Sequence, residues 1–596
     1  MDNQRNLILA VVLSALLLFG WDFAMRTFYP EPETAPTAAA DRVDAPMDRV
    51  DGTAAGSSPA AGAPASDAPA APVTLEASLA APDRIVIDAP EIDGTLNPVG
   101  ARIDDLRLKT HRQDVEADSG PIRLFAPAGT EGQHYAQFGW VGDGVSVPDA
   151  QTVWQVADGS GTLTQDTPVT LLWNNGAGQL FGLRFAIDEH YMFTVTQTVR
   201  NTGTGSIALR PYGVLNRSSA TASASTFNVH SGPIAQGGGE VNFDFDYEDV
   251  AEERAVSLAG STDWLGFTDI YWMSALIAER GQGADGAFRS TGAETFRADL
   301  IYDPVTVGAG DSVTRTTRLF AGAKESGLLD AYEDGGIPNF GRSIDWGWFG
   351  FIAWPMWQVL IFLFDLVGNF GLAIIGLTLV IRAVLFPIAQ KQFASMAQLR
   401  AVQPKMKALQ ERHKDDKQRL QQEMAKLYKE EKVNPLGGCL PIFIQIPIFF
   451  ALYKVLLLAI EMRHQPFLYI SDLSARDPAT LLNLFGLLDF TPPGFLAIGI
   501  LAVLLGFTMW LQFKLNPATM DPMQQQIFMI MPWVLMFVMA PFAAGLLIYW
   551  ISNNVLTLAQ QKYLYSKNPQ LREAMLKEKE EKARAAEREK AAKADG

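Results

Sequence analysis

The chain has 596 residues, enough for several domains, and 48% of them are hydrophobic. A composition of this kind fits a membrane protein that also carries a large soluble part. The single cysteine, Cys439, excludes intramolecular disulfides and a cysteine-based metal site.

The charge is divided along the chain. Residues 30–345 hold 20 lysines and arginines against 44 aspartates and glutamates, whereas the remainder holds 28 against 21. Because positively charged loops stay in the cytoplasm, this division predicts that the acidic part and the basic loops lie on opposite sides of a membrane.

The N-terminal region, residues 1–29, is expected to be a transmembrane signal anchor. Its apolar run, residues 7–23, follows Arg5, and no small-x-small cleavage site comes after it. A cleaved signal peptide is the alternative. Residues 30–82 are rich in Ala, Pro, Gly and Ser with few large apolar side chains, so they predict a disordered linker.

Residues 83–339 show the pattern of an all-β domain. Short alternating runs at 84–88, 167–173, 191–199 and 312–320 have strand periodicity. Asn-Asn-Gly and Asn-Thr-Gly turn signals follow two of them. We expect a large two-sheet sandwich on the outer side of the membrane. Its histidines show no metal-ligand spacing, and no nucleophile motif occurs.

Residues 340–366 predict an amphipathic helix at the membrane surface. Four tryptophans occur within a dozen residues, namely Trp346, Trp348, Trp354 and Trp357. Tryptophan prefers the boundary between lipid and water. The alternative is another spanning helix, which would reverse the orientation of every later loop.

Residues 367–566 predict a membrane-embedded core. Its expected spans are residues 367–388, 437–460, 495–513, 527–544 and 545–561. With the N-terminal anchor they make six spans, and the basic tail, residues 567–596, is then cytoplasmic like the N-terminus.

The loop at 389–436 holds 11 lysines and arginines and is expected in the cytoplasm. Apolar residues at three-to-four spacing predict two helices that break near His413 and form an antiparallel hairpin. Its basic surface suits RNA, a targeting particle or anionic lipid, or it is simply solvated.

An arginine lies inside the second expected span. A guanidinium in the centre of a bilayer costs about 2.5–3.5 kcal/mol, so Arg382 is expected to face protein or a wet recess. Other polar residues occur in the same spans, and they predict a hydrophilic, cationic groove for substrate: Thr378, Gln445, Gln512, Trp550 and Asn553. Each neutral residue alone also suits an interhelical hydrogen bond.

Two other classes of function compete with the hypothesis that the groove around Arg382 binds a substrate. A secondary transporter or channel would use Arg382 as an intramembrane anion site, but inverted repeats are not recognisable. A membrane-anchored carbohydrate-active enzyme would need paired carboxylates in the β domain. The sequence gives no nucleotide, cofactor or metal motif, and we expect no enzymatic activity.

Long strings in the second half of the chain resemble the YidC/Oxa1/Alb3 family of membrane protein insertases. They are VIRAVLFP, DDKQRLQQEMAKLYKEEKVNPLGGCLPIFIQIPIFFALYKVL, LSARDP and DPMQQQIFMIMP. The resemblance is strong over residues 340–565 and weaker at residues 101–109 in the β domain. It is to the Gram-negative type, which has an N-terminal anchor and a large periplasmic domain.

The resemblance implies a periplasmic β-supersandwich and an insertase in the bacterial inner membrane that acts alone or with the Sec translocon. It implies that Arg382, Thr378, Trp550 and Gln512 belong to the groove. The hairpin and the second cytoplasmic loop would meet the ribosome and the targeting particle. Substrates would be nascent integral membrane proteins that slide into lipid along Ile446 and Pro447.

Overall fold

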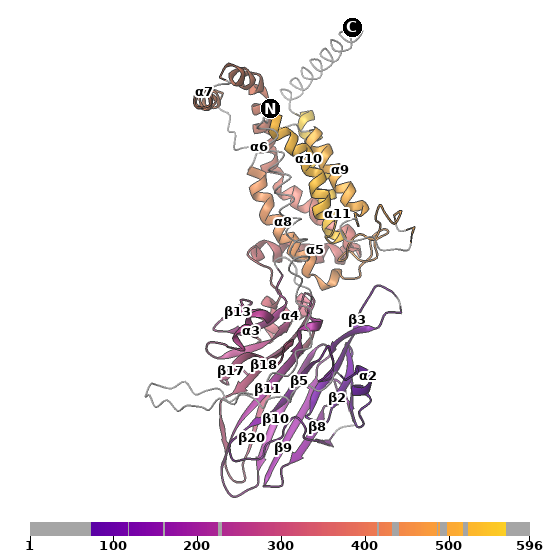
Figure 1. Cartoon of the computed structure of the whole chain (residues 1–596), viewed down its shortest axis with the longest axis vertical. Helices are drawn as coiled ribbons and strands as arrows, with labels where there is room; N and C mark the ends of the chain where they lie inside the picture. The colour runs from indigo at the N-terminus through magenta and orange to yellow at the C-terminus, as the bar shows by residue number, and fades with distance from the viewer. Residues whose placement is uncertain are drawn as a thin grey trace, which may run out of the picture. The chain divides into compact units, whose positions relative to one another are not determined.

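The computed structural model describes residues 73–567 apart from 117, 159–160, 224–228, 414–415, 432–439, 486, 489–496 and 516–521 (Figure 1). The expected anchor at 7–23, nearly all of the linker, Cys439 and residues 568–596 of the tail lie outside the described residues.

Two large sheets make up the β domain. The first has the order β14 (Ala255–Ser257), β17 (Ala284–Ser290), β18 (Thr295–Tyr302), β11 (Ile207–Ser218), β5 (His134–Val141), β3 (Arg102–Arg112), β2 (Ile92–Asn97), β1 (Ile85–Asp88) and β7 (Thr162–Leu163), with β19 (Val305–Val307) on β11 and β4 (Pro121–Phe125) on β3. The second has the order β13 (Glu240–Asn242), β12 (Gly232–Gly237), β15 (Thr262–Thr268), β16 (Trp272–Ala278), β20 (Ser312–Ala323), β10 (Met192–Asn201), β9 (Gln179–Ile187), β8 (Val169–Asn174) and β6 (Gln155–Asp158).

The four strand predictions from the sequence are confirmed in β1, β8, β10 and β20. Along β10, Val195 and Val199 are buried while the threonines between them are half-buried, as period-two alternation requires. The Asn-rich turn signals lie directly after β8 and at the end of β10. Local pattern therefore places these strands correctly.

Side chains from the inner faces of both sheets form one continuous core. A buried glutamine of β10, Gln197, crosses this core, and its Nε2 donates to the carbonyl oxygen of Gly139 on β5 at 2.8 Å. Because an unpaired buried amide is costly, this bond fixes one sheet against the other. The domain also contains short helices: α2 (Leu75–Leu79), α3 (Tyr247–Glu253) and α4 (Ser326–Asp334).

The second half of the chain is helical. Its helices are α5 (Gly350–Val367), α6 (Phe370–Arg412), α7 (Lys417–Glu430), α8 (Leu440–Leu458), α9 (Ile500–Leu515), α10 (Pro522–Met539) and α11 (Ala544–Lys567). Among the described residues, two helices are long and apolar enough to cross a membrane by length and composition, Gly350–Val367 and Phe370–Gln392. Shorter apolar helices occur at Phe443–Leu458, Ile500–Lys514 and Met529–Met539.

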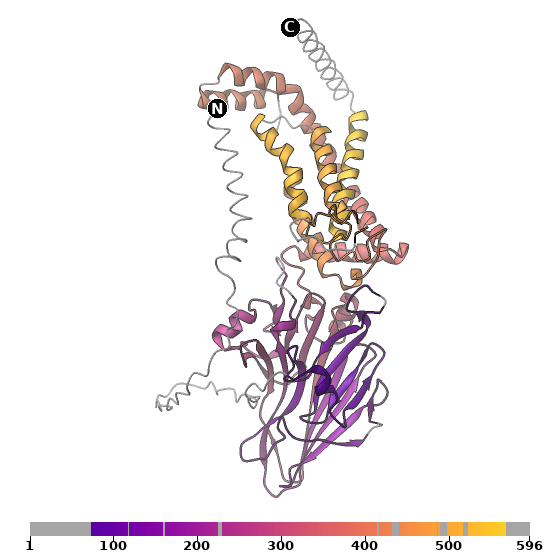
Figure 2. The same ribbon diagram turned by 45° about the vertical axis from the view of Figure 1, so that its right-hand side comes forward.

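Helix α5 runs across the ends of α6 and α8 instead of along them (Figure 2). Its inner side buries Ala353, Trp357 and Leu360, whereas Phe351 and Phe362 on its outer side are exposed. One face thus packs on the helical core and the other is free for an apolar surrounding.

Helix α6 corrects one expected boundary. The expected span 367–388 and the first hairpin helix are one continuous helix of 43 residues. The helix continues through Pro387 and Pro404, and the residues between them contain no Gly and consist mostly of helix-favouring residues that propagate the helix across both sites.

The hairpin itself forms as expected (Figure 2). Helix α6 ends at Arg412, and α7 begins at Lys417 with Asp416 as its N-cap. Between the two helices Val402, Met406 and Leu427 are buried in a small apolar seam. The prediction of a helical hairpin with a thin seam is confirmed.

Several contacts join the β domain to the helices. Lys454 on α8 is buried and pairs with Asp345 at 2.8 Å. The indole Nε1 of Trp357 donates to the hydroxyl of Ser326 at the start of α4 at 2.6 Å. Arg463, in the segment after α8, donates to two backbone carbonyls at the end of β3 and just after it. Each contact involves residues distant in sequence, so the junction depends on tertiary packing.

Candidate functional site: a polar cluster among three helices

Arg382 of α6 is bound by a residue of α11. Its Nε donates to Asn553 Oδ1 at 2.8 Å, and its Nη2 lies 3.4 Å from the backbone oxygen of the same residue. No carboxylate of the described residues lies within ion-pair distance of this guanidinium. The arginine is therefore half-buried, oriented by a neutral amide, and left with N–H groups that can bind another acceptor.

A second polar contact joins α8 to the same helix. Gln445 Nε2 donates to the hydroxyl of Tyr549 at 3.2 Å. Because Tyr549 and Asn553 are four residues apart, they lie on one face of α11. Arg382 and Gln445 therefore approach neighbouring turns of the same helix face.

Trp550 lies beside this cluster. Its ring meets Phe449 of α8 edge-on, with 5.4 Å between the ring centres. Within the described residues its indole Nε1 is buried and has no hydrogen-bond partner. A buried unpaired donor is rare and costly, so this N–H is a polar group of the cluster that the described contacts leave unsatisfied.

Two residues expected in the groove have different surroundings. Thr378 is fully buried, and its hydroxyl donates to the backbone oxygen of Ile374 one turn earlier at 2.7 Å. Gln512 of α9 is half-buried, and no hydrogen bond to Arg382, Gln445 or Trp550 is seen in the described part of the chain. In the structure, Arg382 and Gln445 contact residues of α11, the helix that also carries Trp550 and Asn553. The described hydrogen bonds of these residues include neither Thr378 nor Gln512.

The sequence analysis missed one participant of the cluster, Tyr549. Tyr549 has an apolar appearance beside Ile548, but its spacing of four from Asn553 is a signal that it shares that residue's face. Asn554 is buried and donates to Thr508 of α9 at 3.1 Å. This last pair ties α11 to α9 behind the cluster and holds the helix in place.

The two expected sliding contacts lie on α8. Ile446 is 46% exposed, and Pro447, the next residue, is half-buried within the helix. Both are adjacent in sequence to Gln445, so a polar contact and an apolar exposed surface follow each other on one helix turn.

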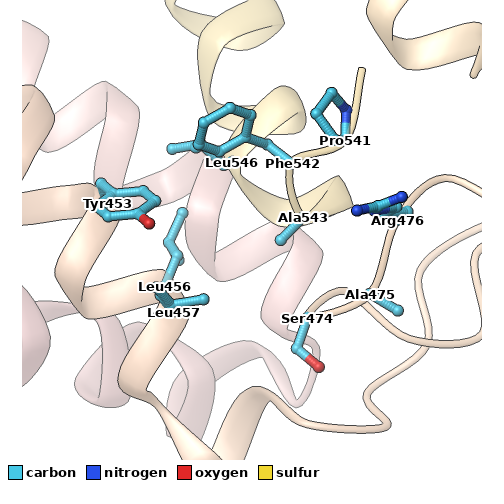
Figure 3. A pocket seen from close by; sticks show the side chains of 10 residues that line it. All are labelled: Tyr453, Leu456, Leu457, Ser474, Ala475, Arg476, Pro541, Phe542, Ala543 and Leu546. Carbon is cyan, nitrogen blue, oxygen red and sulfur yellow. The ribbon is translucent and has the colours of Figure 1, made fainter. Parts of the chain in front are cut away.

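An apolar cavity lies two helix turns further along α8 (Figure 3). Its volume is about 350 Å³, and Tyr453, Leu456, Phe542 and Leu546 supply most of its wall. Arg476 is the one charged residue of its lining. A lining of this kind favours the binding of a hydrocarbon group. The described residues contain no group of three or more metal-binding side chains, here or elsewhere.

Comparison with known proteins identifies relatives over almost the whole chain. The family described as 60Kd inner membrane protein matches residues 362–571, and the family described as YidC periplasmic domain matches residues 84–359. A protein of Zymomonas mobilis named membrane protein insertase YidC is 44% identical over 94% of this chain and 95% of its own length. One of the same name from Bradyrhizobium diazoefficiens is 40% identical, covering 95% and 97%.

A solved structure is also similar. It is titled an active YidC insertase with the first transmembrane domain resolved, and it is 18% identical with a TM-score of 0.35. The match covers 80% of this chain and 92% of the solved one.

Proposed function

The chain belongs to the YidC family of membrane protein insertases, and we propose that it inserts its substrates through the polar cluster of α6, α8 and α11. Members of this family are insertases and not enzymes, and their substrates are nascent membrane proteins. The observation that carries the proposal is Arg382, a guanidinium oriented by Asn553 with no described carboxylate partner.

The difficulty in insertion is the hydrophilic tail of the substrate. Transfer of an unpaired peptide group from water to hydrocarbon costs roughly 4–8 kcal/mol, and a charged group costs more. A groove with fixed donors lowers this cost because it replaces part of the lost hydration. Arg382 is a donor with N–H groups beyond those that Asn553 accepts, so it suits carbonyl and carboxylate groups of the tail.

Apolar segments of the substrate then need a route into lipid. Ile446 is exposed beside Gln445 on α8, and Val384 is 71% exposed beside Arg382 on α6. A substrate helix could leave the cluster along these side chains while its tail still binds Arg382. Burial of its apolar surface, worth about 25 cal/mol per Å², drives the step without nucleotide hydrolysis.

We infer the placement of the chain from its charges. The anchor at 1–29 and five further spans give six spans with both termini in the cytoplasm of a bacterium with an inner membrane. The transverse course of α5 supports a surface helix instead of a further span. The β domain at 83–339 is then periplasmic, and the hairpin at 389–436 faces the cytoplasm.

The hairpin and the second loop, residues 516–526, are the proposed contacts for the ribosome and the targeting particle. A shallow hollow of about 300 Å³ in the hairpin is lined by Lys405, Arg412 and Lys426 together with Glu423 and Glu430. Lys405 pairs with Glu431 and Lys426 with Glu423, so the proposal rests on the excess of basic residues over the whole hairpin and not on this hollow. The Sec translocon is the proposed partner for substrates with large periplasmic parts. Membrane lipids are the remaining proposed partners.

The test is insertion of a small membrane protein into liposomes that hold only this protein. Protease protection of the translocated tail above the level in empty liposomes would support autonomous insertion. Arg280→Ala is the matched control for Arg382→Ala, because Arg280 is exposed on the β domain, outside the polar cluster and the hairpin. Solute flux without tail protection would contradict the proposal and favour a channel or transporter.

A further inference from the structure

A loop between α8 and α9 has an unusual distribution of side chains. Residues 478–488 read PATLLNLFGLL and contain no charged residue. We refer to them as the apolar loop. Its large apolar side chains are exposed at values from 44% to 82%, and they are Leu481, Leu482, Leu484, Phe485, Leu487 and Leu488.

The polar side chains of the same loop face inwards. Thr480 and Asn483 are buried, and the backbone N–H of Thr480 donates to Asn483 Oδ1 at 2.9 Å. Asn483 Nδ2 in turn donates to the backbone oxygen of Pro478 at 3.0 Å. A loop in water has the opposite arrangement, because exposed leucines are hydrated at a cost while amides are solvated freely.

The base of the loop is fixed to the beginning of α9. The N–H of Ile500 donates to the backbone oxygen of Ala479 at 2.9 Å, and that of Leu481 donates to the backbone oxygen of Ile498 at 3.1 Å. The buried carboxylate of Asp477 accepts from the N–H of Leu501 at 2.8 Å. The apolar side chains are therefore held at the helix end and do not hang on a free strand.

The described part of helix α9, residues 500–515, is shorter than the hydrocarbon it would cross. Its 16 residues rise about 24 Å at 1.5 Å per residue, whereas the hydrocarbon core is about 30 Å thick. The missing depth lies at one or both ends of the helix. At the N-terminal end, the apolar loop supplies an uncharged surface where the helix stops.

The chain connection that contains the apolar loop also reaches the junction of α5 and α6. Earlier in this connection between α8 and α9, the backbone oxygen of Pro466 accepts from Asn369 at 3.3 Å, and the ring of Phe467 lies against Gly371. Asn369 is the N-cap of α6 and follows α5 closely, whose outer face exposes Phe362 and Leu366. Residues 466–467 of the connection and the exposed outer face of α5 therefore lie at the N-terminal end of α6.

We propose that the apolar loop is inserted into the lipid leaflet on the side of the β domain, where its leucines contact acyl chains. The hydrocarbon complements the uncharged exposed surface, and the inward amides need no water. The loop thereby completes the apolar length of α9 and anchors the outer end of the bundle. This inference rests on the membrane placement proposed above, but it does not require that the groove acts on substrates.

The test measures the depth of a nitroxide label in vesicles of phosphatidylethanolamine and phosphatidylglycerol. Leu487→Cys is made in a Cys439→Ser background of the full chain and labelled. Oxygen concentrates in hydrocarbon, whereas a water-soluble nickel chelate stays outside it. Leu504→Cys, on the exposed apolar side of α9, is the lipid reference. Ser206→Cys, on an exposed turn of the β domain, is the water reference.

We expect the label at Leu487 to relax with oxygen and resist the nickel chelate, as at Leu504. Accessibility to nickel like that at Ser206 would overturn the proposal. A label shielded from both reagents only when substrate is present would also overturn it, because the loop would then bind a protein segment. Tail protection by the same labelled protein is measured in parallel. Lipid contact without tail protection would reject the proposed function and leave this inference standing.

Discussion

The contact between Arg382 and Asn553 gives the sharpest prediction about insertion. Arg382→Ala removes the only guanidinium described in the polar cluster, so a carboxylate of the substrate tail loses a charge-assisted hydrogen bond. Such a bond contributes about 1.5–3 kcal/mol. Since 1.4 kcal/mol is a factor of ten, the rate of insertion should fall about tenfold to a hundredfold for a substrate with an acidic tail.

The magnitude depends on the charge of the tail and on the orientation of the arginine. With a tail in which Asp and Glu are replaced by Asn and Gln, we expect Arg382→Ala to lower insertion only about two- to tenfold, since neutral hydrogen bonds contribute about 0.5–1.5 kcal/mol. Arg382→Lys keeps the charge and should recover most of the rate. Asn553→Ala frees the guanidinium from its acceptor and should lower insertion about two- to tenfold through orientation alone.

The assay is the initial rate of protease protection in liposomes, with the acidic and neutral tails on one substrate. Thermal unfolding of each variant in detergent shows whether the bundle remains intact. Equal losses with both tails would refute the reasoning, because the arginine would then act on packing and not on substrate charge. Full activity of Arg382→Ala with both tails would exclude the groove role altogether.

Three further predictions concern stability. Lys454→Met leaves Asp345 without its buried partner and should lower the free energy of unfolding by about 1–3 kcal/mol in denaturant titrations. Burial lowers the pKa of Lys324 to about 8. Between pH 8 and about 10.4 the unfolded chain then binds a proton that the folded chain does not, so stability should rise by about 3 kcal/mol across this window. Gly266→Ala places a Cβ 1.9 Å from a backbone oxygen of the next strand and should cost about 1–3 kcal/mol, whereas Gly205→Ala meets no atom within 4 Å and should cost little.

Each of these has a defined contradiction. Lys426→Met, in α7, is the control for Lys454→Met. Its ion pair with Glu423 is exposed and should contribute under 1 kcal/mol. Equal losses in the two lysine variants would show that the junction is not buried in solution. The pH-dependent rise must disappear in Lys324→Met, and its persistence would assign the rise to another group. Equal melting temperatures of the two glycine variants would contradict the strand contact.

Much of the fold could be read from local sequence. Strands β1, β8, β10 and β20 follow from alternation over a few residues, and the hairpin follows from apolar positions three and four apart. A residue in a strand or helix senses chiefly its neighbours in the chain, so these patterns are visible without the fold. The isolated arginine in an apolar span is equally visible, because its cost depends only on the length of the span around it.

The boundaries of the helices were harder to predict from the sequence. Helix α6 continues past the expected end of the second span into the hairpin although Pro387 lies there, because the helix-favouring residues that follow carry the helix on. Length alone also does not decide which apolar helices cross a membrane. Only Gly350–Val367 and Phe370–Gln392 pass that criterion among the described residues, and the first of them runs across the bundle.

The sequence by itself determined the class of protein, the two-part organisation and the presence of a buried cation. Only the tertiary structure decided which groups meet it. Asn553 accepts a hydrogen bond from Arg382, 171 residues away in the sequence, and Tyr549 accepts one from Gln445, 104 residues away. Thr378 instead donates to a backbone oxygen of its own helix. A hydrogen bond between helices depends on their rotation and depth relative to each other, and packing over the whole bundle sets both.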